Sequence, residues 1–167
     1  MQTVILPGHS SKNKEWADLT AANLKIDGQI RPIFWDHWID PEQLFYPKEK
    51  ATIISKHARG DTMNIIGHSV GTLVASYIIS EVSNQINKVI LCGIPLYDLS
   101  SEEKEDIKKA ISSLPKEKLI CFQNINDPHA TFAEVKSFLP EGINLVQKES
   151  SDHNYPYFED FNNYLTS

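Results

Sequence analysis

Short runs of apolar residues alternate along the chain with longer stretches in which apolar and polar residues recur at helical spacing. The apolar runs are rich in Val and Ile and are bounded by turn or polar residues, which is typical of buried strands. They predict strands at residues 3–7, 30–35, 63–67, 88–94, 118–124 and 143–149. The intervening stretches predict helices at residues 14–24, 47–58, 70–83, 101–114, 131–139 and 156–165.

Each predicted strand is followed by a predicted helix. This alternation favours an α/β fold, a three-layer α/β/α sandwich around a mostly parallel six-stranded sheet whose faces are both covered by helices. Ligands of such sheets bind beyond the carboxyl ends of the strands. Because no repeat, linker or low-complexity segment interrupts the pattern, we expect residues 1–167 to form a single domain.

Charge and composition narrow the classes of partner. The formal net charge is −6 at pH 7 and no stretch is rich in Lys or Arg, which argues against nucleic acid and against a membrane surface. No uncharged apolar run approaches the ~20 residues needed to cross a bilayer. Cys92 and Cys121 lie in apolar runs, as buried thiols of a reducing compartment do. We therefore expect a cytoplasmic protein with a small-molecule substrate; the sequence does not indicate an oligomeric state.

The stretch Gly67-His68-Ser69-Val70-Gly71 carries the first chemical signal. A serine hydroxyl becomes a nucleophile when it is exposed, close to a base and close to N–H donors for the developing oxyanion. A sharp strand-to-helix turn meets these needs, provided that the residues two before and two after the serine lack bulk. Here the strand pattern ends before Ser69 and a helix pattern follows it, so we expect a nucleophile at Ser69.

A second Gly-His-Ser triplet ends in Ser10, and Lys12 occupies the position where the second glycine should stand. The long side chain of Lys12 conflicts with close helix-on-strand packing, so Ser10 is not expected to be the nucleophile. The alternative interpretation of Ser69 is a serine that caps a helix between two turn glycines.

Partners for Ser69 follow later strands in the order that this type of sheet requires, first an acid and then a histidine. Asp127 follows the strand at 118–124, and His153 follows the strand at 143–149. We expect His153 to remove the proton of Ser69 and Asp127 to orient the imidazole. Asp98, on the loop after the strand at 88–94, is an alternative acid.

The oxyanion hole is expected to consist of two backbone N–H groups. One belongs to Val70, the residue after the nucleophile, and the other to His9, after the first strand. The alternative for Pro7-Gly8 is a plain turn. No cluster of His, Cys and carboxylates has metal-ligand spacing, so we expect no metal and no cofactor.

A substrate pocket without a lid must be built from loops at the strand ends. Trp35, His37 and Trp38 follow the second strand and Tyr97 follows the fourth, and together they could form an aromatic wall. The alternative is that the tryptophans pack on the sheet edge and the neighbouring helix.

These motifs together resemble the α/β-hydrolase superfamily, and within it the small serine hydrolases without a lid of the retinoblastoma-binding-protein-9 type. The resemblance rests on "LPGHSS", Glu15-Trp16, "IIGHSVGT", "NDPHA" and "DHNYP", and extends from Val4 to about Phe161. It implies six parallel core strands and a triad of Ser69, Asp127 and His153. The family usually has glycine where this chain has Asp152, which puts the efficiency of the base in question.

The expected function is hydrolysis of a small acyl ester or amide through an acyl-enzyme on Ser69. The sequence does not decide between ester, amide and thioester. Two alternatives stay open: an acyltransferase with the same triad, and a hydrolase-fold binding or regulatory module with little turnover.

Overall fold

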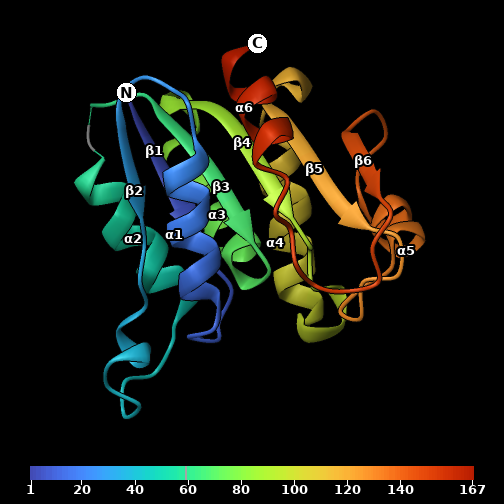
Figure 1. The fold of residues 1–167 in the computed structure, drawn as a ribbon, viewed down its shortest axis with the longest axis horizontal. Helices are drawn as coiled ribbons and strands as arrows, with labels where there is room; N and C mark the ends of the chain where they lie inside the picture. Colours follow the sequence, from blue (N-terminus) through green and yellow to red (C-terminus); the bar gives the residue numbers. More distant parts are fainter. Residues whose placement is uncertain (59) are drawn as a thin grey trace.

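The computed structural model describes residues 1–58 and 60–167 and contains every predicted strand. The strands form one sheet in the order β2-β1-β3-β4-β5-β6, and all neighbouring pairs are parallel (Figure 1). Their bounds are β1 (Gln2–Leu6), β2 (Gln29–Pro32), β3 (Met63–His68), β4 (Ile86–Cys92), β5 (Leu119–Asn124) and β6 (Asn144–Lys148). The chain moves outward from β1 to β2 and returns to the other side of β1 as β3. The loops after β1 and β3 therefore meet at a topological switch point, where open α/β sheets bind ligands.

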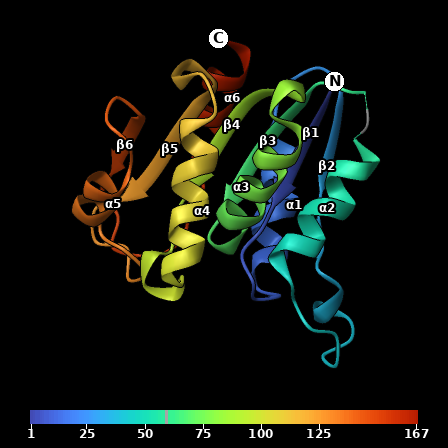
Figure 2. The same ribbon diagram turned by 180° about the vertical axis from the view of Figure 1, so that it is seen from behind.

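Helices cover both faces of the sheet, which confirms the three-layer arrangement. Helices α1 (Asn13–Asn23) and α6 (Phe158–Thr166) cover one face. Figures 1 and 2 show the other helices on the opposite face. They are α2 (Pro47–His57), α3 (Val70–Val82), α4 (Ser101–Ser112) and α5 (Phe132–Phe138).

Two buried clusters form the core, one on each side of the sheet. Successive side chains of a strand point to opposite faces. In β3, Ile65 belongs to the cluster under α2, α3 and α4, whereas Ile66 belongs to the cluster under α1 and α6. Both are fully buried. The near-continuous apolar runs of the central strands follow from this two-sided burial.

Several predicted elements are shorter in the structure than the pattern indicates, and β2 and α6 illustrate why. β2 ends at Pro32 instead of residue 35, and the chain then turns so that Trp35 is buried. α6 begins at Phe158 instead of residue 156, because Tyr157 has non-helical backbone angles and donates its hydroxyl to Oδ1 of Asn124. Cys92 and Cys121 are free and buried, as expected. Among the described residues, no helix is long and apolar enough to cross a membrane.

Candidate active site

Ser69 is the single residue between β3 and α3, and its backbone is strained. Its φ of 56° and ψ of −126° lie in a region that side chains other than glycine rarely adopt. Among the described non-glycine residues, Ser69 alone has a positive φ. Its N–H donates to the carbonyl of Cys92 at 3.0 Å, and its carbonyl accepts from the N–H of Thr72 at 2.9 Å. The turn is therefore held at both ends.

Two glycines make this turn possible. A Cβ on Gly71 would lie 2.0 Å from the carbonyl oxygen of Leu6, and one on Gly67 would lie 2.8 Å from the carbonyl oxygen of Gly71. Both neighbours are backbone atoms that cannot move aside. The G-x-S-x-G pattern is thus required by the close approach of α3 to the ends of β1 and β3.

His153 and Asp127 are brought together at the carboxyl ends of β5 and β6. Nδ1 of His153 donates to Oδ2 of Asp127 at 2.7 Å, and Asp127 is 1% exposed. The same oxygen accepts the hydroxyl of Tyr155 at 2.5 Å, while Oδ1 accepts the N–H of His129 at 2.8 Å. Burial on its own would raise the pKa of Asp127, but these hydrogen bonds outweigh it and hold the pKa below its ordinary value. The carboxylate is therefore ionised and able to orient the imidazole.

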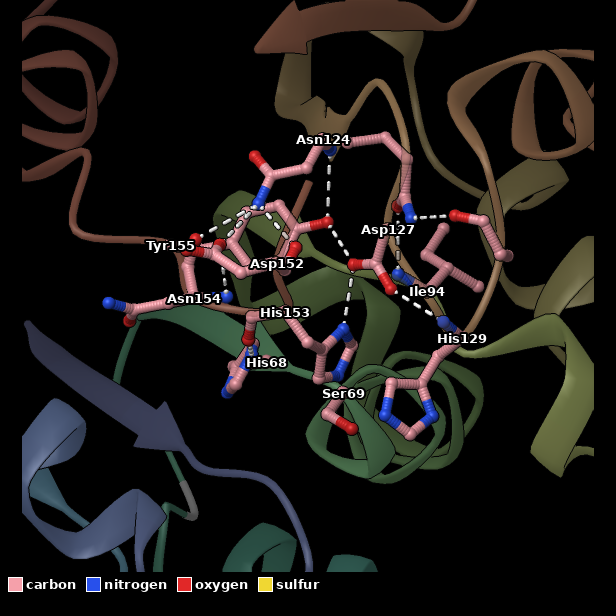
Figure 3. A network of polar contacts seen from close by, with 12 residues as sticks. His68, Ser69, Ile94, Asn124, Asp127, His129, Asp152, His153, Asn154 and Tyr155 are labelled. Atoms are coloured by element: carbon pink, nitrogen blue, oxygen red, sulfur yellow. Dashed lines mark hydrogen bonds and ion pairs between the residues drawn. The ribbon is translucent and has the colours of Figure 1, made fainter. Parts of the chain in front are cut away.

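The second nitrogen of His153 is the free one. Nε2 is buried and has no hydrogen-bond partner among the described residues. His153 and Ser69 line one cavity of about 440 Å³, and Figure 3 shows the imidazole next to the serine side chain. The structure thus places Ser69 and His153 in one cavity, with Asp127 hydrogen-bonded to the other side of the imidazole.

His9 and Val70 line the same cavity. Among the described residues, neither backbone N–H has an acceptor. The loop between β1 and α1 packs closely on the side chain of Asn13 at Gly8, where an added Cβ would lie 2.8 Å from that side chain. The His9 ring stacks on His37 with centroids 4.3 Å apart. Burial lowers the pKa of His9, and the nearby His37 lowers it further, so the ring is neutral at pH 7.

The residues expected to form an aromatic wall make hydrogen bonds to other parts of the chain. Trp35, His37, Trp38 and Tyr97 do not contribute to the cavity beside Ser69 among the described residues. Instead, Nε1 of Trp35 donates to the carbonyl of Gly8 at 3.0 Å, and Trp38 and His37 donate to the carbonyl of His9 at 2.7 and 2.8 Å. These side chains support the loop between β1 and α1, because its carbonyls need donors. The hydroxyl of Tyr97 donates to Glu134 at the start of α5.

The two other carboxylates considered near His153 have different partners. Asp98 lies 2.5 Å from Nδ1 of His129. Oδ1 of Asp152 accepts the N–H of Asn154 at 3.0 Å and Nδ2 of Asn124 at 3.3 Å. The departure at position 152 therefore closes a turn in the loop and leaves the imidazole of His153 to Asp127.

Sequence reasoning missed the residues that hold the histidine loop. Tyr155 is fully buried, and its oxygen also accepts the N–H of Asn124 at 3.0 Å. The Asn124 side chain donates to the carbonyls of Asp152 and Asn154. Gly93, with a φ of +61°, lies under the loop, and a Cβ there would be 2.6 Å from the Tyr155 ring and 2.9 Å from Cε1 of His153. A glycine directly after a buried strand was the available signal.

His68 in the turn is structural. It is 2% exposed, its ring lies 4.7 Å from that of Trp16, and Nε2 donates to the carbonyl of His153 at 3.1 Å. Burial, followed by the nearby His153, lowers the pKa of His68 to about 3. The ring is thus neutral and helps to fix the loop that carries His153.

Comparison with known proteins establishes the class of fold. The sequence matches no known family model and no curated protein. The structure is similar to a protein assigned as a YdeN-like hydrolase from Pectobacterium atrosepticum, with 17% identity and a TM-score of 0.68 over 98% of this chain and 89% of that chain. Est1E from Butyrivibrio proteoclasticus, solved with ferulic acid bound, has 13% identity and a TM-score of 0.68 over 99% and 88% of the two chains.

An extracellular α/β-hydrolase from a Paenibacillus species has 11% identity and a TM-score of 0.65 over 99% and 98% of the chains. At these identities the likeness is one of fold. The protein has the α/β-hydrolase fold, as the resemblance in sequence implied.

Proposed function

We propose that the protein is a serine hydrolase that cleaves a small acyl ester or amide. Ser69 attacks the carbonyl carbon while Nε2 of His153 accepts its proton, and the tetrahedral oxyanion is bound by the N–H groups of His9 and Val70. The intermediate collapses as His153 returns the proton to the leaving group, which gives an acyl-enzyme. Water, activated by the same imidazole, then releases the acid.

One observation carries this proposal. The imidazole of His153 has one nitrogen on a buried carboxylate and the other without a partner, in the cavity that Ser69 lines. A carboxylate on Nδ1 leaves the neutral ring with its lone pair at Nε2, which is the form a general base needs. Among the described residues, Nδ1 of His37 and Nδ1 of His68 are also buried without a partner, but neither residue lines this cavity.

The backbone at Ser69 supports the same role. A strained φ persists where the surrounding structure over-determines it, and such residues cluster at functional sites. The first turn of α3 also points its N–H groups and positive dipole end toward the place where the oxyanion develops. The solved structures with this fold, which are named as hydrolases, support hydrolysis as the reaction class.

A fluorophosphonate probe followed by peptide mass spectrometry tests the proposal. We expect one adduct, on Ser69, that is absent in Ser69→Ala and strongly slowed in His153→Ala. Turnover of 4-nitrophenyl acetate should fall by orders of magnitude in both variants. Ser137→Ala is the matched control, because Ser137 is an exposed serine on α5 that lies outside the cavity lining. A folded protein that never labels and never turns over ester would instead favour a binding module.

A further inference from the structure

A second histidine–carboxylate pair stands beside the first. Nδ1 of His129 lies 2.5 Å from Oδ2 of Asp98, and the His129 and His153 ring centroids are 4.2 Å apart. Because the N–H of His129 donates to Oδ1 of Asp127, one carboxylate anchors both histidines. Figure 3 shows the two rings side by side next to Ser69. The His129 ring is therefore fixed, and it forms part of the cavity wall.

Asp98 binds Nδ1 of His129 and so leaves Nε2 as the ring nitrogen without a partner in the described part of the chain. An ionised carboxylate only accepts hydrogen bonds, so the ring proton that faces Asp98 is on Nδ1, and in this neutral tautomer Nε2 has no proton. Nε2 then carries a lone pair, and among the described residues no side chain or N–H donates to it. The wall thus offers an acceptor at this position.

Two carboxylates extend this wall. Oε2 of Glu103 accepts the N–H of Ser100 at 2.8 Å and caps α4, while Oδ2 of Asp98 binds His129. The other oxygen of each carboxylate has no donor among the described residues. No lysine or arginine of the described chain lines the cavity to neutralise them. We call His129, Asp98 and Glu103 the acceptor wall.

Apolar residues surround the acceptor wall in the cavity, and they decide how strongly it selects a substrate. Val70, Leu73, Pro95 and Leu99 supply apolar surface around Ser69. A bound substrate would displace water from the wall, and an acceptor that loses water without gaining a donor is costly. A site built to bind a hydroxyl or N–H group discriminates strongly against an analogue that lacks it.

Resting on the proposed function, we infer that the substrate carries a hydrogen-bond donor, a hydroxyl or a protonated amine, a few atoms from the reacting carbonyl. The acceptor wall binds this donor while the apolar lining binds the adjoining hydrocarbon. This wall accordingly sets specificity, whereas Ser69 and His153 set the chemistry.

Matched esters test the inference, with kcat/KM measured by pH-stat. 3-(Dimethylamino)propyl acetate, protonated at pH 7, is compared with its carbon isostere 4-methylpentyl acetate. 4-Hydroxybutyl acetate is compared with pentyl acetate, and both pairs are repeated with the donor in the acyl part of ethyl esters. We expect a preference of about tenfold for the donor in one pair, the size of a hydrogen bond to a charged or polarised group. The pair that shows it distinguishes amine from hydroxyl.

Variants assign the preference to the wall. Asp98→Asn and Glu103→Gln keep an oxygen that can accept from His129 and from Ser100 but remove the charge, and each should reduce the amine preference. Glu102→Gln is the matched control, because Glu102 is exposed on the same turn of α4 and lies outside the cavity lining. Its preference ratio should equal that of the wild type. Thermal melting verifies that all three variants are folded.

The outcomes separate the two proposals. Ratios near one for every pair, in a protein that labels at Ser69 and turns over 4-nitrophenyl acetate, overturn the inference and leave the hydrolase standing. An amine preference that persists unchanged in both wall variants also overturns it. If the wild type neither labels nor turns over any ester, the proposed function fails and the inference fails with it.

Discussion

The hydroxyl of Tyr155 donates to Oδ2 of Asp127 at 2.5 Å, the same oxygen that binds the imidazole of His153. Burial, with a contribution from this hydrogen bond, raises the pKa of Tyr155, so it stays a phenol and a donor. The tyrosine thus acts on the proposed base through the acid. It is a positioning residue that touches neither Ser69 nor the space where substrate binds.

Removing this donor should disturb the placement of the base. In Tyr155→Phe we expect kcat for 4-nitrophenyl acetate to fall about tenfold, because a hydrogen bond to a buried charge is lost. The carboxylate of Asp127 loses a hydrogen bond and becomes more basic, so it should stabilise the imidazolium of His153 more and move the acid limb of the pH–rate profile upward. Tyr164→Phe is the control, since its hydroxyl binds the distant carbonyl of Glu117. Unchanged kinetics in Tyr155→Phe would show that His153 and the N–H of His129 hold the carboxylate without the tyrosine.

Gly93 should be irreplaceable for activity. In Gly93→Ala the new methyl group would meet Tyr155 and His153, so we expect the histidine loop to move and kcat to fall at least about 100-fold, as it does when a reacting group is misplaced by about 1 Å. Gly60→Ala is a matched control, because Gly60 also has a positive φ of +89° but no heavy atom within 4 Å of the added Cβ. It should lose about 1 kcal/mol of stability and keep full activity. Equal kinetic losses in the two variants would mean that backbone strain, and not the contact, is responsible.

The acid can be assigned by an isosteric change. Asp127→Asn should reduce kcat about 10³- to 10⁴-fold, because a carboxamide cannot hold the imidazole in the correct tautomer. Asp152→Asn, next to the histidine, should stay within about twofold, since an amide oxygen can still accept the N–H of Asn154. Steady-state kinetics on the two variants decides the matter. The reverse result would make Asp152 the acid.

His68 should make the fold acid-sensitive. Its pKa is about 3 in the folded protein because of burial, and about 6.5 in the unfolded chain. Between these values the unfolded chain binds the proton and the folded protein does not, so stability falls as pH falls. The slope from this group is about 1.4 kcal/mol per pH unit. Urea unfolding at pH 7, 6 and 5 should show His68→Gln losing that slope. Parallel curves for the two proteins would contradict the assignment.

The strand and helix pattern predicts the sheet because the central strands are buried on both faces. The turn at Ser69 is predictable for a local reason, since Gly67 and Gly71 are needed where backbone approaches backbone. The order of Asp127 and His153 follows from the parallel strands. By contrast, the positions of Trp35 and Trp38 are not predictable from the pattern. Their indole N–H groups donate to the carbonyls of Gly8 and His9, which are far away in sequence. No periodicity reports such long-range pairing of donors and acceptors.

Tyr155 and Gly93 were not identified from the sequence, for a related reason. Each matters because the loop after β6 crosses the end of β4, and that crossing is a tertiary contact between segments about 60 residues apart. His129 lies two residues after Asp127 in the sequence. The structure shows that its backbone N–H binds that carboxylate and its ring binds Asp98.

β6 is an outer strand of the sheet and pairs with β5 alone. The loop that carries His153 follows this edge strand, whereas Ser69 follows β3 in the interior of the sheet. Fraying of one margin would therefore carry the imidazole away while the interior stays intact. Mild heating or denaturant should abolish catalytic activity reversibly before the whole protein unfolds. Amide hydrogen exchange at residues 144–148 should increase under the same conditions.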